Sequence, residues 1–455
     1  MPDLVPYRRI HVIGAGGAGM SGLAKILAQS GHQVSGSDLK PGPALTALAA
    51  AGVETWVGHR PDAAASWDLV VASSAVPDRD PEVRSAREHS VAVWDRPRLL
   101  QALTGRMRTI GVTGTHGKTT GTAMLVAALR ALGSDPSFMV GGELVDLATN
   151  AHLGETDLFA LEADEAFGTF LSLELQGLVI TNVEPDHLDH YGSLADLEAA
   201  FTDVARTVEG PVLAGIDDPG AAAVAARVPQ VIGYGTGAEA RWRISELSHH
   251  PGAVAFRLTG PDAEMVVEVP KPGVHVARNA AGALALLGEM GFDVVGAAAG
   301  LARFSGVRRR FETRARIAGV TVVDDYAIHP SEIAATIAAA ALGGAGRIVA
   351  VFQPHRFTRT QEMGVELGEA LAGAGRVFVT DVYPASEAPI PGITGRVVAD
   401  AAQRSGADVT YVPRRADLAV EVAAEATEGD TVLLMGAGDI TLVADELAPL
   451  LAGEA

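Results

Sequence analysis

The chain of 455 residues is 48% hydrophobic and 20% charged, a composition that supplies the cores of roughly two to four globular domains. Its net charge of −20 argues against nonspecific nucleic-acid binding, and the absence of cysteine excludes disulfides and thiolate sites. No apolar run approaches the ~18 residues of a membrane span, and no signal-peptide segment precedes the strand predicted at residues 9–13, so we expect a cytoplasmic protein that spans no membrane.

The first predicted unit, residues 8–38, reads as strand, glycine loop, helix and strand. The loop matches G-x-G-x-x-G, a pattern that brings backbone amides close to a pyrophosphate, and Asp38 follows the second strand. The loop residues are Gly14, Ala15, Gly16, Gly17, Ala18 and Gly19. The pattern predicts a pyrophosphate site without naming the nucleotide, and a tight turn without a ligand is the alternative.

A later strand, predicted at 69–72, ends in Ser73 and Ser74. Small polar residues at the carboxyl end of a parallel strand lie where such sheets bind ligands, although helix or turn capping explains them equally well. A helix is predicted at 96–104, and we place the first domain boundary at residue 104.

A second glycine-rich loop, Gly-Val-Thr-Gly-Thr-His-Gly-Lys-Thr-Thr at 111–120, precedes a helix predicted at 122–132. Val112 stands where the pattern G-x-x-x-x-G-K-[ST] has glycine, so the loop is a variant of the usual phosphate loop. Lys118 is suited to the outer phosphates of a nucleotide, and the hydroxyl of Thr119 to Mg²⁺. An ordinary strand-to-helix turn is the alternative. The loop residues that we assign to the nucleotide are Gly114, Thr115, His116, Gly117, Lys118, Thr119 and Thr120.

Two acidic segments follow strands predicted at 158–161 and 178–180. The first begins with Glu162, and the second contains His187 within Asn-Val-Glu-Pro-Asp-His-Leu-Asp. The carboxyl ends of parallel strands meet at one sheet edge, so both segments are expected near the phosphate loop. Mg²⁺ prefers oxygen ligands, which suits Glu162, whereas His187 is a less usual ligand for a second ion. Residues 210–270 are predicted to form irregular strands and turns.

A helix opens near Lys271 and carries His275 and Asn279, which can cap it or reach a ligand. The basic run at 307–311 includes Arg310, and the second domain boundary follows at 312. From 319 onward strands and helices alternate, which predicts a parallel sheet with strands near 319–324, 347–352, 376–381, 408–412 and 431–435. Polar residues gather after these strands: Tyr326, His329, His355, Arg356 and Arg359. Arg356 and Arg359 are suited to binding carboxylates, with surface ion pairs as the alternative.

Together these motifs resemble the Mur ligase family over the whole chain. The most specific are residues 16–22, 114–120, 182–189 and 352–360. The resemblance implies an α/β protein of three domains. These are a Rossmann-like N-terminal domain for a UDP-sugar (1–104), a P-loop-type central ATPase domain (105–312) and a Rossmann-like C-terminal domain for an amino acid (313–455).

The resemblance also assigns roles to residues. It places Asp38, Ser73 and the loop at 14–19 on the UDP-sugar. The nucleotide site comprises the loop at 114–120 with His275, Asn279 and Arg310, and the metal ligands are Thr119, Glu162 and His187. Lys118, His187, His329, Arg356 and Arg359 are implied to be catalytic, and Tyr326, His355, Arg356 and Arg359 to line the substrate and amino-acid site.

The activity implied is ATP- and Mg²⁺-dependent joining of L-alanine to the lactyl carboxylate of UDP-N-acetylmuramate in peptidoglycan synthesis. Three alternatives stay open: a murein-tripeptide recycling ligase, a nicotinamide oxidoreductase and a non-catalytic nucleotide-sugar-binding protein. Two positions depart from the family, which usually has Asn at Val276 and Gly-His-His-Pro at residues 327–330. The oligomeric state is not indicated by the sequence.

Some relatives carry a carbamylated lysine in the central domain. Here Lys118 and Lys271 are the lysines of residues 105–312. The first is assigned to phosphate and the second precedes the nucleotide helix, so activity independent of bicarbonate is expected.

Overall fold

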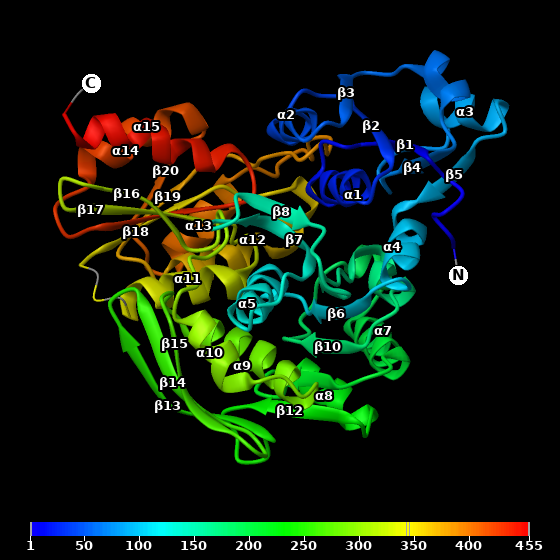
Figure 1. Cartoon of the computed structure of the whole chain (residues 1–455). Coiled ribbons are helices and arrows are strands. Elements are labelled where there is room, and N and C mark those ends of the chain that lie inside the picture. The colour runs from blue at the N-terminus through cyan, green and yellow to red at the C-terminus, as the bar shows by residue number, and fades with distance from the viewer. Residues whose placement is uncertain (1, 343, 345, 454–455) are drawn as a thin grey trace. The chain divides into compact units, whose positions relative to one another are not determined.

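The computed structural model describes residues 2–342, 344 and 346–453, which form three sheets covered by helices (Figure 1). The chain divides into two compact units. Unit 1 comprises Met1–Ser245, Arg257–Val267 and Arg278–Ser305, and unit 2 comprises Glu246–Phe256, Glu268–Ala277 and Gly306–Ala455. The predicted α/β class is confirmed, because most strand pairs are parallel and helices connect them.

The first sheet has the strand order β3-β2-β1-β4-β5, and all its pairs are parallel. The order reverses between β1 and β4, so the loops after these strands border the crevice where such sheets bind ligands. The strands are β1 (Arg9–Ile13), β2 (Gln33–Asp38), β3 (Glu54–Val57), β4 (Leu69–Ala72) and β5 (Ala92–Asp95). The helices are α1 (Ala18–Gln29), α2 (Pro43–Ala50), α3 (Pro81–Glu88) and α4 (Arg96–Thr104), with a 3₁₀ turn at Pro61–Ser66.

The second sheet has ten strands in the order β15-β14-β13-β12-β11-β10-β6-β9-β7-β8. Strand β6 pairs in parallel with both β9 and β10, so the segments after these three strands meet at one edge. The strands are β6 (Arg108–Thr113), β7 (Ser137–Leu144), β8 (Thr149–His152), β9 (Leu158–Glu162), β10 (Gly177–Ile180), β11 (Val212–Gly215), β12 (Val231–Gly235), β13 (Trp242–His250), β14 (Ala253–Thr259) and β15 (Glu264–Val269).

The helices around this sheet are α5 (Lys118–Ala131), α6 (Leu188–Tyr191), α7 (Leu194–Thr207), α8 (Pro219–Arg227), α9 (Val274–Glu289) and α10 (Val294–Leu301), with a 3₁₀ segment at Ala166–Ser172. Helix α5 begins at Lys118, four residues before its predicted start, because Gly117 already turns the chain into the helix. The prediction of irregular strands over 210–270 was wrong for α8. Asp218 caps this helix by accepting a hydrogen bond from the amide of Ala221.

The third sheet lies in unit 2 and has the order β16-β17-β21-β18-β19-β20. Its five predicted strands are confirmed, and β16 adds an antiparallel edge. The strands are β16 (Glu312–Ile317), β17 (Val320–Asp325), β18 (Ile348–Phe352), β19 (Arg376–Val379), β20 (Val409–Tyr411) and β21 (Thr431–Met435). The helices are α11 (Pro330–Leu342), α12 (Phe357–Leu371), α13 (Arg396–Arg404), α14 (Leu418–Glu425) and α15 (Leu442–Leu451), with 3₁₀ turns at Arg415–Asp417 and Asp439–Thr441.

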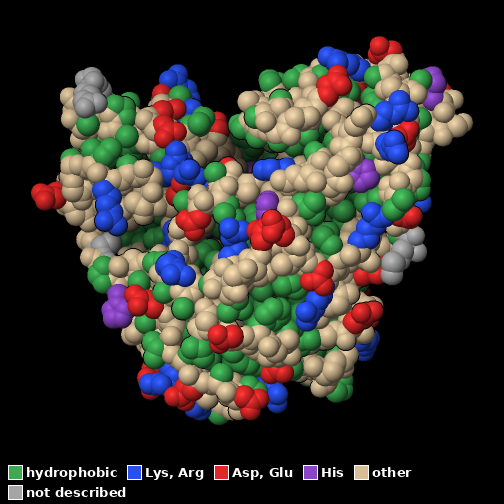
Figure 2. Space-filling view, in the orientation of Figure 1, with side chains coloured by type: hydrophobic (Ala, Val, Ile, Leu, Met, Phe, Trp, Pro, Cys, Tyr) green, Lys and Arg blue, Asp and Glu red, His purple; other side chains and the backbone are tan. Residues whose placement is uncertain are grey.

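Figure 2 shows Asp and Glu side chains interspersed with Lys and Arg side chains on the face in view, so the net charge of −20 is not gathered into one patch there. Within the described part of the chain, every helix is too short or too polar to cross a membrane.

Candidate active site

The phosphate-type loop joins β6 to α5, and two of its glycines are required by close neighbours. Gly114 has φ +132° and lies so close to the hydroxyl of Thr181 that no side chain fits. Gly117 has φ +83°, and a Cβ there would be 2.6 Å from Oδ1 of Asn279. Both positions therefore demand glycine for conformation and for space. Asn279 in α9, which the resemblance assigns to the nucleotide, thus lies directly on the loop.

The loop is held by the segment after β10. The hydroxyl of Thr181 donates to the carbonyl oxygen of His116 at 2.6 Å, and the amide of His116 donates to Oδ1 of Asn182 at 2.8 Å. The amide of Glu184 donates to the hydroxyl of Thr115 at 2.8 Å. These bonds fix the loop before any ligand arrives, which is the preorganisation that phosphate binding requires.

Lys118 lies at the start of α5 with its ammonium turned back onto the loop. Nζ donates to the carbonyl oxygen of Gly114 at 2.7 Å and to Oε1 of Glu165 at 2.7 Å. Burial alone would lower the pKa of Lys118, but the Glu165 and Asp164 carboxylates outweigh it and raise that pKa. Burial raises the pKa of Glu165, and Lys118 opposes this rise. Glu165 is therefore a partner of the loop lysine that sequence analysis did not single out.

Thr119 and Glu162 lie together, as predicted for a metal site. The Thr119 hydroxyl is 3.1 Å from Oε1 of Glu162, and the amide of Gly141 donates to Oε2 at 2.6 Å. A hydroxyl and a carboxylate are the hard oxygen donors that Mg²⁺ prefers, so the residues present fit this ion. The carboxylate orientation is set by the backbone of β7, which the sequence pattern did not indicate.

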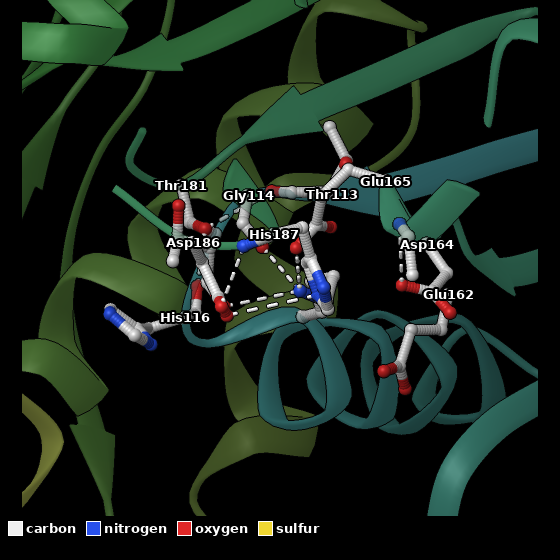
Figure 3. Close-up of polar contacts among 12 residues, drawn as sticks. Thr113, Gly114, His116, Glu162, Asp164, Glu165, Thr181, Asp186 and His187 are labelled. Carbon is white, nitrogen blue, oxygen red and sulfur yellow. Dashed lines mark hydrogen bonds and ion pairs between the residues drawn. The ribbon is translucent and has the colours of Figure 1, made fainter. Parts of the chain in front are cut away.

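His187 follows β10 with φ +53°, and its ring faces Asp186 with Nε2 3.8 Å from Oδ2. In the view of Figure 3, the Asp186–His187 pair and Glu162 lie on opposite sides of Thr113 at the end of β6. His116, within the loop, has Nε2 3.3 Å from Oε2 of Glu184. The two acidic segments thus flank the loop, as expected for neighbouring parallel strands.

The N-terminal glycine loop makes its own set of contacts. The amide of Gly16 donates to Oδ2 of Asp38 at 2.9 Å, so Asp38 lies against the loop. A Cβ on Gly14 would be 3.0 Å from Cβ of Ser73, which places Ser73 beside the same loop. The Ser73 hydroxyl also accepts from the amide of Ala75 at 3.4 Å, the turn-capping contact that was the alternative.

In unit 2, the arginines before β16 surround Tyr326. The guanidinium carbons of Arg309 and Arg310 lie 5.2 Å and 5.0 Å from its ring centroid. Arg309 also donates to the carbonyl oxygens of Gly436, Ala437 and Gly438 at 2.6–3.2 Å. Arg309 therefore joins the residues before β16 to the loop after β21, a structural role that sequence analysis missed because the partners are 127–129 residues apart.

The two arginines after β18 have different surroundings. Nε of Arg356 donates to Oε1 of Glu387 at 2.5 Å, so this residue is already paired. Nη1 of Arg359 lies 3.4 Å from Nδ1 of His355, and none of the described residues offers Arg359 an acidic partner. Burial, Arg359 and Arg356 together lower the pKa of His355 to about 4. The guanidinium of Arg359 can therefore pair with an anionic ligand.

The remaining predicted residues lie at helix starts of unit 2. His329 is buried before α11, with Nδ1 3.0 Å from the hydroxyl of Ser331, and its amide donates to Glu332 at 3.2 Å. The ring of His275, in the first turn of α9, packs on Gly273. At the departure from the family pattern, Val276 is buried with 4% of its surface exposed, where a side chain without polar groups fits.

Three family models match successive parts of the chain. They are "Mur ligase family, catalytic domain" over residues 9–108, "Mur ligase middle domain" over 112–287 and "Mur ligase, glutamate ligase domain" over 309–438.

Individual proteins match the chain almost end to end. The UDP-N-acetylmuramate–L-alanine ligase of Mycobacteroides abscessus is 42% identical, with 98% of this chain and 96% of the relative covered. That of Kineococcus radiotolerans is 44% identical with the same coverage, 98% and 96%. The crystal structure of UDP-N-acetylmuramate–alanine ligase from Thermotoga maritima is 27% identical with a TM-score of 0.85, over 98% of this chain and 100% of that chain. A murein peptide ligase from Psychrobacter arcticus shares the fold, with a TM-score of 0.71 at 23% identity and 98% of each chain covered.

Proposed function

The chain belongs to the Mur ligase family, and from this premise we propose that it joins L-alanine to the lactyl carboxylate of UDP-N-acetylmuramate while ATP is cleaved to ADP and phosphate. The observation that carries the proposal is the similarity to relatives named UDP-N-acetylmuramate–L-alanine ligase, which extends over 98% of the chain at 42–44% identity. The sequence motifs, the three-sheet fold and the prearranged phosphate loop agree with it.

In this proposal, the loop Gly114–Thr120 binds the ATP phosphates. Its backbone is held in place by the segment after β10, and Asn279 lies against Gly117. Lys118 moves its ammonium from Glu165 to the phosphates, where it neutralises charge as the γ-phosphoryl group is transferred. The family resemblance assigns His275 and Arg310 to the same nucleotide.

Thr119 and Glu162 would hold Mg²⁺, and His187 would be a ligand of a second ion. When bound, the metal neutralises charge on the phosphate oxygens. Glu162 is oriented for this by the amide of Gly141, and Thr119 by its place in the first turn of α5.

The reaction has two steps. An oxygen of the lactyl carboxylate forms a bond to the γ-phosphorus, the bond from that phosphorus to the β-phosphate oxygen breaks, and ADP leaves. The alanine amine then attacks the acyl carbon, loses a proton, and displaces phosphate as the carbon–oxygen bond breaks. Both steps gather anionic oxygens, so catalysis consists of positioning and charge neutralisation.

The UDP-sugar is held by the loop at 14–19 with Asp38 and Ser73. The amino acid and the acyl group are held by unit 2, through Tyr326, His329, His355, Arg356 and Arg359. Arg359 is the strongest candidate for the alanine carboxylate because it lacks an acidic partner among the described residues.

Phosphate release tests the function. The native protein with ATP, Mg²⁺ and UDP-N-acetylmuramate is expected to release phosphate only when L-alanine is added, and mass spectrometry should find UDP-N-acetylmuramoyl-L-alanine. A preference for L-alanyl-γ-D-glutamyl-meso-diaminopimelate over L-alanine would establish the recycling ligase instead. Reduction of a nicotinamide cofactor without phosphate release would indicate an oxidoreductase.

A further inference from the structure

Arg96 lies outside every set of residues assigned above, yet its guanidinium rests on the N-terminal glycine loop. It is the first residue of α4, directly after β5. A Cβ on Gly19 would be 3.1 Å from both Cζ and Nη2 of Arg96. Gly19 belongs to the first turn of α1, so the absence of a side chain there lets a cation lie against the start of this helix.

The guanidinium of Arg96 has unfilled hydrogen-bonding capacity. Nε is buried and has no hydrogen-bond partner in the described part of the chain. Nη1 is 3.8 Å from Oδ2 of Asp164, a distance at which the two charges attract without a hydrogen bond. A buried guanidinium nitrogen without an acceptor is costly, and 23% of the Arg96 side chain is exposed, so an anionic ligand can add its charge to the part of the guanidinium outside Nε.

The surroundings of Arg96 add a second electrostatic reason. The N-terminus of α1 carries partial positive charge from its free amides. Gly17 supplies no side-chain cap, and the first turn contains no acidic residue. A cation next to a helix N-terminus is unfavourable without a ligand and becomes favourable once an anion lies between the two.

We propose that Arg96 is a binding residue for the diphosphate of the UDP-sugar, which it holds against the first turn of α1. The proposal rests on the proposed function for the identity of the ligand. The planar guanidinium can donate to two phosphate oxygens, which an ammonium at this place would not do. Binding of the diphosphate draws Arg96 away from Asp164, two residues after the metal-site residue Glu162, and so connects the sugar-nucleotide site to the acidic segment beside Lys118.

Isothermal titration calorimetry on the full chain with UDP-N-acetylmuramate and with UDP tests this role. Arg96→Gln is expected to weaken both ligands about ten- to a hundredfold, the effect of losing a charge-assisted hydrogen bond, with Arg96→Lys intermediate. Arg98→Gln is the matched control. It lies on the same helix but stacks on Trp94, 4.7 Å from the ring centroid, and should bind like the native protein.

A second measurement separates binding from folding. Uridine lacks the diphosphate, so the ratio of the UDP inhibition constant to the uridine inhibition constant should rise in Arg96→Gln and stay unchanged in Arg98→Gln, while the KM for ATP is retained. An unchanged ratio, or equal loss for UDP and uridine, would overturn the role of Arg96. A native protein that binds no UDP-N-acetylmuramate would instead overturn the proposed function.

Discussion

Nζ of Lys118 and Oε1 of Glu165 form an ion pair at 2.7 Å, with 15% and 1% of the two side chains exposed. The second carboxylate oxygen of Glu165 is buried and has no hydrogen-bond partner among the described residues. The pair brings the phosphate loop together with the segment after β9 and holds the lysine in place before nucleotide binds. The ammonium of Lys118 can therefore neutralise a nucleotide phosphate only when that phosphate displaces Glu165 or binds beside it.

Lys118→Ala should reduce ATP turnover by orders of magnitude while the UDP-sugar still binds, because the loop loses its phosphate cation. It should also destabilise the fold by about 3–5 kcal/mol, since Glu165 is left buried without its partner. Steady-state kinetics, calorimetry and urea unfolding measure the three quantities. Equal losses of UDP-sugar affinity and turnover would contradict this division of roles.

A double variant tests the pair itself. Lys118→Ala with Glu165→Gln should recover part of the lost stability, because the unpaired charge is gone, but none of the turnover. Arg130→Ala is the control on the same helix, since its exposed ion pair with Asp135 should contribute little. No recovery in the double variant would mean that the pair contributes little to stability.

Glu162→Gln should raise the Mg²⁺ concentration needed for half-maximal activity and lower kcat, because it removes the charge beside Thr119. The same direction is expected for Thr119→Ala and His187→Ala. Titration of activity with Mg²⁺ provides the measurement. The control is Asp157→Asn, because Asp157 is exposed and directly precedes β9, at the end of the strand opposite to Glu162. If one of the three variants keeps the native Mg²⁺ dependence, the residue substituted in it is not a metal ligand.

Arg359→Ala should weaken use of L-alanine or of the sugar carboxylate by about 2–5 kcal/mol in kcat/KM while ATP affinity is kept. Arg356→Ala should act in the same direction but also lower stability, because Glu387 loses its cationic partner and keeps only its hydrogen bonds from Thr358. Substrate titrations of both variants, with exposed Arg404→Ala as control, separate the effects. Native kinetics in both variants would mean that neither arginine binds a substrate carboxylate.

Acid should destabilise the protein through His355, whose folded pKa is lowered from 6.5 to about 4 by burial and by Arg359 and Arg356. Below pH 6.5 the unfolded chain binds a proton that the folded chain does not, so stability present above pH 6.5 is lost as pH falls toward 4. His355→Gln should lack this loss, on the order of 1–2 kcal/mol after solvent screening. Urea unfolding at pH 7 and pH 4.5 compares the two, and parallel curves would remove His355 as the cause.

Activity should be unchanged when bicarbonate and CO₂ are removed. Of the lysines in 105–312, Lys118 is in its ion pair with Glu165, and Nζ of Lys271 lies 3.4 Å from the carbonyl oxygen of Phe311. Intact-mass measurement checks for a carbamate directly. A carbamylated lysine together with activity restored by bicarbonate would contradict the prediction.

Local chemistry made much of the site predictable from the sequence. Gly114 and Gly117 are needed at positive φ between β6 and α5, and such glycines mark a phosphate loop without tertiary information. The residues that follow the strand ends could also be predicted from the sequence. Glu162 follows β9, His187 follows β10, and parallel pairing of β6 with both strands brings these segments to one edge. The domain boundaries at 104 and 312 stay predictions.

The pairings of charged side chains were decided only by the tertiary structure. Lys118 meets Glu165 across 47 residues, and Arg309 reaches Gly436 across 127. Arg356 is paired with Glu387, whereas Arg359 has no acidic partner among the described residues. The spacing of the two arginines in the sequence does not predict this difference. Hydrophobic periodicity and turn chemistry encode which residues lie at a strand end, because they act over a few residues. Which carboxylate or glycine a long side chain meets depends on how distant elements pack, and this packing placed Arg96 on Gly19.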